Sequence, residues 1–239
     1  MSHNAAAKLH ETDTCIFLRE LPISGPNFFG RDLELDQIYN ILIPEKSKQK
    51  GVVLWGLSGS GKTCLTLRYI KLYLHKYSAV LWIDAPGCDL TGAGQSDLER
   101  PGLERATECF SQAAVTIAAE YTSFASRQPA NSPKGQDFVK KWLEERSNKS
   151  WLTVIDSVDD LDEFDWRSLL PRCNHGTVIV TSTRSRTSIS PGFEAVEVGC
   201  LGERAACELL LSKSDPAHHT LEGKPPRNLR CLGLLILHT

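Results

Sequence analysis

The sequence predicts an α/β protein in which a mostly parallel sheet of five strands lies between layers of helices. Short, nearly continuous apolar runs alternate with longer segments whose apolar residues recur at helical spacing. This alternation is typical of a parallel sheet that helices cover on both faces. The 239 residues, of which 41% are hydrophobic and 23% are charged, are enough to bury such a core.

Each expected strand is short and apolar, and the five segments are 52–55, 79–83, 151–155, 177–181 and 195–198. Helical patterns occupy 33–42, 65–74, 103–121, 136–145 and 203–211. The polar, Gly-containing stretch 88–102 indicates a surface loop. Because ligands of parallel sheets bind at the carboxyl ends of the strands, we expect the functional residues at that edge.

The composition of the chain argues against several classes of partner. The formal net charge is −2, so no global cationic field attracts nucleic acid or an anionic membrane, and we expect neither as a partner. No apolar stretch approaches the length of a membrane span, and the eight cysteines include no C-x-x-C pair. These features predict a reduced, cytoplasmic protein. Residues 1–25 are expected to be a flexible segment that precedes one domain.

The strongest motif follows the first expected strand and precedes a helix. Its sequence matches G-x-x-x-x-G-K-[ST] at every position and comprises Gly56, Leu57, Ser58, Gly59, Ser60, Gly61, Lys62 and Thr63. Glycines let the backbone amides approach phosphate groups at the N-terminus of the helix. Lys62 would reach the β- and γ-phosphates, and the Thr63 hydroxyl would ligate Mg²⁺. The motif predicts a P-loop for ADP, ATP or another purine nucleotide, and hence a three-layer P-loop NTPase fold.

A second motif is the apolar segment that ends in Asp156. It is typical of a Walker B strand, in which the aspartate binds Mg²⁺ directly or through water, although a turn or capping aspartate gives the same pattern. Ser157 follows, where many hydrolysing ATPases carry a second acid, and serine is a poor base without an activating partner. Asp159 and Asp160 are candidate substitutes or helix caps. Fast hydrolysis is therefore not expected.

Three further residues have open interpretations. Arg184 follows the fourth strand and is either a γ-phosphate sensor or a surface arginine near Arg186. Arg31 either positions the base or sugar of the nucleotide or anchors the N-terminal linker to the core. Asp84 ends the second strand and is either a cap or a site residue.

The ordered set of motifs resembles the NB-ARC group of STAND nucleotide switches, in the style of fungal NOD-like receptors. The segments that carry the likeness are 28–35, the P-loop, 80–85, 151–160, 176–184 and 196–211. The resemblance implies that ADP holds a closed form and that ATP favours an open, oligomerising form. It also implies that Lys62 and Thr63 bind phosphate and Mg²⁺, that Asp156 is the Walker B acid, that Arg184 is the sensor, and that Arg31 lies near the nucleotide.

The resemblance also gives domain boundaries. Residues 26–212 correspond to the nucleotide-binding core, and residues 213–239 form a divergent tail in which the helical bundle, winged helix and repeats of relatives are not recognisable. We therefore expect a truncated core that acts as an ADP/ATP switch with slow or absent hydrolysis in signalling or self/non-self responses. Expected partners are further copies of the chain or other NOD-like receptor-type proteins.

Two alternatives remain from the residues alone. One is an active P-loop enzyme, either an AAA+-like ATPase or a small-molecule kinase; the arginine-rich lid of a kinase has only Arg184 and Arg186 as candidates. The other is a non-hydrolysing receptor fragment. As an enzyme, the chain is expected to be at most a slow NTPase.

Overall fold

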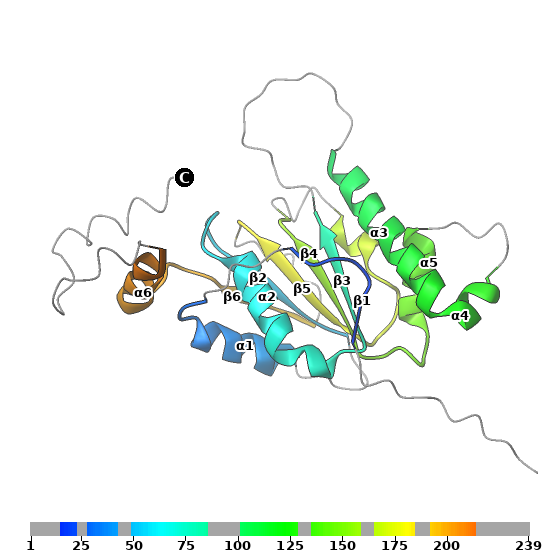
Figure 1. The fold of residues 1–239 in the computed structure, drawn as a ribbon, viewed down its shortest axis with the longest axis horizontal. Coiled ribbons are helices and arrows are strands. Elements are labelled where there is room, and N and C mark those ends of the chain that lie inside the picture. The colour runs from blue at the N-terminus through cyan, green and yellow to red at the C-terminus, as the bar shows by residue number, and fades with distance from the viewer. Residues whose placement is uncertain are drawn as a thin grey trace, which may run out of the picture.

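The computed structural model describes residues 15–22, 28–42, 49–85, 101–128, 135–158, 165–184 and 192–213. Helices connect most of the successive strands along the chain (Figure 1). The strands are β1 (Ile16–Phe17), β2 (Lys50–Trp55), β3 (Ala79–Asp84), β4 (Trp151–Asp156), β5 (Thr177–Ser182) and β6 (Phe193–Glu197). The helices are α1 (Asp32–Leu42), α2 (Lys62–Tyr73), α3 (Pro101–Glu120), α4 (Thr122–Ser126), α5 (Gln136–Glu144) and α6 (Glu203–Lys213), with short 3₁₀ turns at Leu74–Lys76 and Trp166–Leu169.

The strands form one sheet in the order β1-β3-β4-β5-β2-β6, and every pairing between them is parallel. The predicted α/β class with a parallel sheet is confirmed, but the sheet has six strands rather than five. The additional strand is β1, which pairs with β3 through Ile16 and Phe17 only. Two residues are too few to show an alternating or apolar pattern, so the sequence could not reveal this edge strand.

The expected flexible segment 1–25 therefore contains an ordered part. Besides the two strand residues, Leu18 is completely buried, and its amide donates to the carbonyl of Val80. We call residues 15–22 the N-terminal arm. The arm packs along the outer side of β3, and this places residues far apart in sequence at the same sheet edge.

Helices cover both faces of the sheet and form the predicted three layers (Figure 1). One face packs on α1 and α2, where Val52, Leu54, Val80 and Val154 share a core with the helices. The opposite face packs on α3, α4 and α5, where Leu81, Ile83, Ile155 and Val180 lie in a second core. Successive side chains of a strand point in opposite directions, so the inner strands β2, β3, β4 and β5 are buried on both faces.

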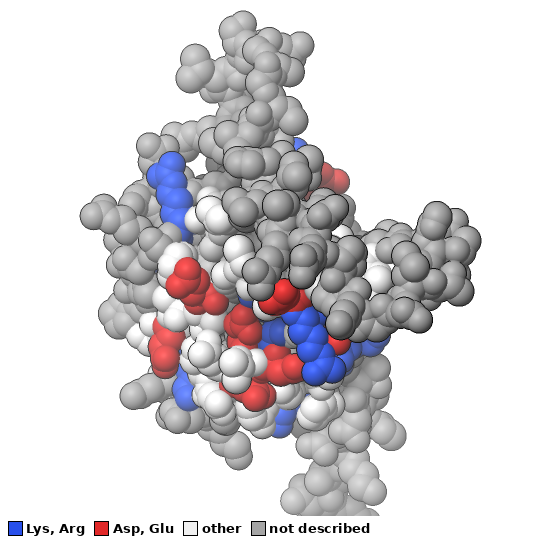
Figure 2. All heavy atoms as spheres, turned by 90° about the vertical axis from the view of Figure 1, so that its left-hand side faces the viewer, with Lys and Arg blue, Asp and Glu red and all other residues white. Residues whose placement is uncertain are grey.

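Beyond β6, helix α6 lies at the end of the molecule that Figure 2 faces. Acidic and basic side chains both occur on the described part of this end, and no continuous basic patch is visible on that part in this view (Figure 2). Among the described residues, no helix is both long enough and apolar enough to cross a membrane. The divergent tail, except its first residue Lys213, lies outside the described residues, as do Asp159, Asp160 and Arg186.

Candidate functional site

The P-loop connects β2 to α2, and its backbone depends on glycine. Gly56 has a φ of 156°, and a Cβ there would lie 2.3 Å from the Val198 carbonyl oxygen, so no larger residue fits. Gly61 caps the N-terminus of α2 in the left-handed region, with a φ of 94°. Only glycine adopts these conformations without strain. The first turn of α2 follows directly from the loop, and the first amides of a helix have no partners within it and can bind an anion.

Lys62 lies inside this loop rather than in solvent. Its Nζ donates hydrogen bonds to the carbonyl oxygens of Gly56 and Leu57, both at 2.9 Å, and the residue is buried. An ammonium group that faces the enclosed space of a glycine-rich loop is suited to a phosphate. The Ser60 hydroxyl is also buried and has no hydrogen-bond partner within the described part of the chain. The loop therefore has polar capacity that a phosphate would satisfy.

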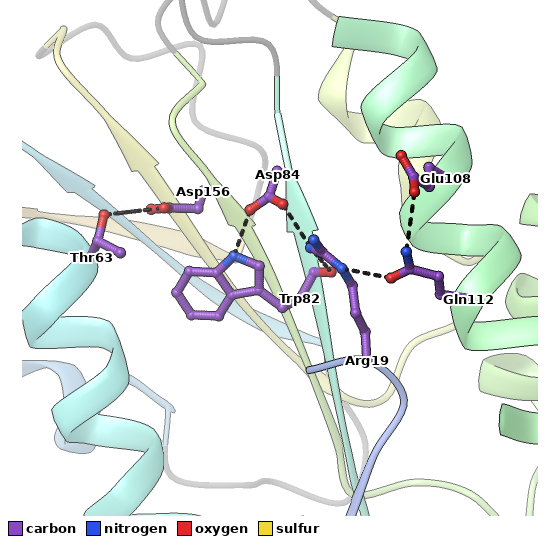
Figure 3. Close-up of polar contacts among 7 residues, drawn as sticks. All are labelled: Arg19, Thr63, Trp82, Asp84, Glu108, Gln112 and Asp156. Atoms are coloured by element: carbon purple, nitrogen blue, oxygen red, sulfur yellow. Dashed lines mark hydrogen bonds and ion pairs between the residues drawn. The ribbon is translucent and has the colours of Figure 1, made fainter. Parts of the chain in front are cut away.

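Asp156, at the end of β4, lies against the start of α2. The Thr63 hydroxyl is 3.1 Å from each carboxylate oxygen, and the Thr181 hydroxyl on β5 donates to Oδ1 at 2.6 Å. Figure 3 shows the carboxylate directed at Thr63. Strand β5 lies between β2 and β4, and it supplies the second hydroxyl. The structure thus brings together the two residues that the sequence proposed as Mg²⁺ ligands, 93 positions apart.

The environment of Asp156 changes its acidity. Burial raises the pKa of Asp156, because desolvation disfavours the charged form, and the hydrogen bonds from Thr181 and Thr63 partly oppose that rise. The negative charge of Asp84 raises the pKa further, whereas the Lys62 ammonium lowers it. A carboxylate that burial makes costly to ionise would be stabilised by a cation beside it.

A second carboxylate extends the site along the sheet edge. Asp84 ends β3 and is the register partner of Asp156. Its Oδ1 accepts a hydrogen bond from Trp82 Nε1 at 3.0 Å, and its Oδ2 lies 2.7 Å from Nη1 of Arg19 in the N-terminal arm (Figure 3). The sequence left Asp84 open between a cap and a site residue, and these contacts place it at the same edge as Asp156.

Arg19 is the residue that sequence reasoning missed. Its Nε donates to Gln112 of α3 at 3.1 Å, and Gln112 in turn donates to Glu108 at 3.3 Å (Figure 3). The partners of Arg19 lie 63 to 93 positions away in the chain, so no local pattern indicates them. The only available signal was a basic residue next to the short apolar run 16–18.

Arg31 acts as an anchor in this structure. Its guanidinium forms an ion pair with Glu34 at 2.7 Å and donates to the carbonyl oxygens of Ser60, in the P-loop, and Gly199, after β6. The side chain is only 7% exposed. Of the two interpretations from the sequence, these contacts match the one in which Arg31 anchors the segment before α1 to the core. The contact of Arg31 with the P-loop is the hydrogen bond to the Ser60 carbonyl oxygen.

Two other residues occupy the loops after β4 and β5. Ser157 has a φ of 65°, and its amide donates to the Thr181 hydroxyl at 2.8 Å. Arg184 is exposed at the carboxyl end of β5, and its amide donates to the Ser182 hydroxyl at 3.2 Å. Because β5 lies between β2 and β4, Arg184 follows the strand at the middle of the site.

These residues fit a nucleotide phosphate and Mg²⁺. Mg²⁺ keeps several water ligands and usually takes one or two protein oxygens together with phosphate oxygens. The Thr63 hydroxyl and the Asp156 carboxylate are such a pair, next to a loop suited to phosphate. Among the described residues, no group of three or more His, Cys, Asp or Glu side chains forms a self-contained metal site.

The parallel sheet between two layers of helices and the glycine-rich loop between β2 and α2 are the features of a P-loop NTPase fold. No family model matches the sequence. No curated protein matches it either.

Solved structures resemble the chain in fold. A STAND protein with a tetratricopeptide repeat sensor from Pyrococcus horikoshii matches at a TM-score of 0.46 and 19% identity, over 82% of this chain and 26% of that one. Cdc6p from Pyrobaculum aerophilum matches at 0.46 and 14%, over 78% and 51%. The ORC2 protein of Aeropyrum pernix, solved as ADPNP–ADP complexes, matches at 0.48 and 14%, over 90% and 58%. This chain spans between about a quarter and just over half of their lengths.

Proposed function

We propose that this chain binds ADP or ATP with Mg²⁺ and acts as a nucleotide-dependent regulatory switch of the NB-ARC/STAND type, with slow or absent hydrolysis. The observation that carries the proposal is the pair of 3.1 Å contacts between the P-loop Thr63 and Asp156. These contacts join the end of the phosphate loop, which follows β2, to an acid at the end of β4. Strands β2 and β4 are not adjacent in the sheet, because β5 lies between them.

Each residue has a defined task in this proposal. The amides of the P-loop, from Gly56 to Thr63, would hold the phosphates, and Lys62 would turn from the loop carbonyls to the β- and γ-phosphates. Thr63 and Asp156 would hold Mg²⁺, which supplies neutralisation of phosphate charge when bound. Arg31 would stabilise the loop through the Ser60 carbonyl.

A switch requires a contact that differs between the ADP and ATP states. Arg184 is the candidate, because it follows β5 at the middle of the site and its long side chain is exposed. It would contact the γ-phosphate and so favour one conformation of the protein when ATP is bound. In this proposal the ATP state assembles with further copies of the chain or with NOD-like receptor-type partners in the cytoplasm, in a signalling or self/non-self response.

Slow hydrolysis follows from Ser157. Ser157 occupies the position at which a second acid is expected, and its amide donates a hydrogen bond to the Thr181 hydroxyl.

An AAA+-like ATPase is the second candidate function. Asp84 favours it, because this carboxylate lies one strand from Asp156 at the same edge of the sheet.

The test of nucleotide binding compares Lys62→Ala with Lys71→Ala, which alters an exposed lysine of the same helix. Purified protein is denatured, and the released nucleotide is identified by chromatography. Wild type and Lys71→Ala should release ADP or ATP, and Lys62→Ala should release little, because the Lys62 ammonium contacts the phosphates directly. Equal release from all three proteins would refute the assignment of the site.

The switch itself is tested with Arg184→Ala. We expect weaker binding of ATP with unchanged binding of ADP, measured by titration calorimetry with Mg²⁺ present. An equal loss for both nucleotides would remove Arg184 as the discriminating contact.

A further inference from the structure

The site contains two aspartates on the same face of the sheet. Asp84 and Asp156 are register partners at the ends of β3 and β4. Leu152 and Val154 of β4, and Trp82, two residues before Asp84, all pack in the core beneath α1 and α2, whereas Trp151 and Ile155 of β4 pack in the core on the opposite face. Side chains two positions further along a strand point the same way, so both carboxylates lie on the face of α2, the helix that begins at the P-loop.

The two carboxylates are nonetheless held in different directions. Asp156 points to Thr63, whereas Asp84 points to the Trp82 indole and to Arg19 (Figure 3). Each oxygen of Asp84 already accepts one strong donor, at 3.0 Å and 2.7 Å. The Asp84 side chain is 38% exposed, so a water molecule can reach it.

From this arrangement, and resting on the nucleotide binding proposed above, we infer that Asp84 is the acid that orients the attacking water in ATP hydrolysis and that Arg19 restrains it. Asp84 thereby supplies, from the neighbouring strand, the function for which Ser157 has no carboxylate. Asp84 is the catalytic residue of this proposal, because it touches the reacting water. Arg19 is a positioning residue that acts through Asp84.

The chemical step is the attack of water on the γ-phosphorus of ATP. A bond forms between the water oxygen and phosphorus, and the bond from phosphorus to the β,γ-bridging oxygen breaks, so that ADP leaves with the electron pair. Asp84 accepts a hydrogen bond from the water and aligns its lone pair with phosphorus. The proton of the water passes to the phosphate product, and the products are ADP and inorganic phosphate.

The restraint by Arg19 depends on the N-terminal arm. Ile16 and Phe17 of the arm pair with β3, the Leu18 amide donates to the Val80 carbonyl, and Arg19 comes next, held by Gln112 and by the Trp82 carbonyl. The ion pair is partly exposed, and pairs of this kind are weak enough to open and close. While it is closed, Oδ2 of Asp84 is held by Arg19; when it opens, that oxygen can accept a hydrogen bond from the attacking water. The position of the arm would therefore set the hydrolysis rate.

The first experiment removes the acid. Asp84→Asn keeps the shape of the side chain, and Asp36→Asn, on the exposed side of α1, is the matched control. We measure single-turnover ATP hydrolysis and, separately, the binding of ADP and of ADP–aluminium fluoride with Mg²⁺. Asp84→Asn should slow hydrolysis by about 10-fold or more and weaken the aluminium fluoride complex, while ADP binding stays unchanged. An unchanged rate and unchanged aluminium fluoride affinity would overturn the proposal.

The second experiment releases the restraint. Arg19→Gln should raise the hydrolysis rate constant by up to about fivefold, the range that a surface ion pair allows, with no change in the affinity for ATP. Arg19→Lys should restore a rate close to that of wild type, and Arg127→Gln, in the exposed ion pair with Glu145, is the control. In the Asp84→Asn background, Arg19→Gln should have no effect on the rate. A rise of equal size in that background, or a fall in the single variant, would overturn the role of Arg19.

The two proposals fail in different ways. If wild-type protein does not bind nucleotide, the proposed function is wrong. If wild type binds ADP and ATP but no variant, including Arg19→Gln, hydrolyses ATP, then nucleotide binding stands and the assignment of Asp84 as a catalytic acid is overturned.

Discussion

Strands β3 and β4 end in the same dipeptide, Ile-Asp, at the same level of the sheet, yet their aspartates occupy different surroundings. Asp156 is 8% exposed, and two neutral hydroxyls donate to it. Asp84 lies one strand nearer the sheet edge, is partly exposed, and has an arginine and an indole as donors. The pattern of an apolar strand ending in aspartate therefore does not by itself define a role; the neighbouring elements do.

The difference follows from strand order. Asp156 lies between β3 and β5, so neighbours exclude water from it, and α2 begins directly against it. Among the described strands, Asp84 has the short β1 on its outer side, so the arm can place a full positive charge beside it. A buried carboxylate with neutral donors calls for a cation, whereas an exposed carboxylate already paired with arginine does not.

Removing the charge of each aspartate in turn is the strongest test of the difference between them. Asp156→Asn should raise the Kd for Mg²⁺·ATP by about 10- to 100-fold, because a ligand of the ion is lost, whereas Asp84→Asn should change it by less than about threefold. Titration calorimetry with Mg²⁺ and with EDTA separates the ion-dependent part, which alone should respond. Equal losses in the two variants would mean that both aspartates ligate the ion.

Asp156→Asn should stabilise the nucleotide-free protein although it weakens Mg²⁺·ATP binding. Because the pKa of Asp156 is raised in the folded chain, the folded state holds the proton more tightly than the unfolded state, and stability from this group declines as pH rises from the unfolded pKa through the folded pKa. At neutral pH, Asp156→Asn should therefore raise the Tm of the nucleotide-free protein by roughly 2–4 °C, about 1 kcal/mol in a chain of this size. Mg²⁺·ATP affinity should fall as pH decreases through the raised pKa. A lower Tm for Asp156→Asn at neutral pH would contradict this account.

Thr181→Val should lower both the stability of the protein and its affinity for Mg²⁺·ATP. The substitution keeps the shape of the side chain but removes the 2.6 Å donor to Asp156, and it also removes the acceptor for the Ser157 amide. We expect a loss of about 1–3 kcal/mol in the free energy of unfolding, measured by urea denaturation, together with weaker Mg²⁺·ATP binding. Thr181→Ser, which retains the hydroxyl, should recover most of both.

The smallest effect is expected from Arg19→Gln on stability. Both partners of its ion pair are partly exposed, so solvent screens the interaction, and the free energy of unfolding should change by less than about 1 kcal/mol. Urea denaturation at low and high salt checks this. A loss as large as that of Thr181→Val would mean that Arg19 holds the arm in place rather than acting on Asp84.

Much of the fold could be predicted because its signals are local. Strands β2, β3, β4 and β5 are mostly apolar runs of six residues, and the P-loop is a contiguous motif in which the backbone conformation requires Gly56 and Gly61. Helix α3 begins two residues earlier than the pattern indicated, at Pro101, because proline suits the first turn of a helix. Strand β1 could not be predicted, because its two residues gain their structure from β3.

The residues of the candidate site also divide into those that a local sequence pattern indicates and those that no local pattern indicates. Lys62, Thr63 and Asp156 have motif positions, so the sequence names them. The contacts of Arg31 with the Ser60 and Gly199 carbonyls match one of the two interpretations that the sequence left open, and no local pattern indicates them. Arg19 has no motif at all, because its partners come from β3 and α3.

By itself, the sequence determined the chemical groups of this protein: the phosphate loop, the acid at the end of β4, the missing acid at Ser157 and the alternation that requires a parallel sheet. The tertiary structure alone decided which of these groups meet. Sheet order brings Thr63 to Asp156 across β5, and an edge strand of two residues carries Arg19 to Asp84. The physical reason is that hydrogen bonds and ion pairs act over a few ångströms in space, whereas sequence patterns record only neighbours along the chain.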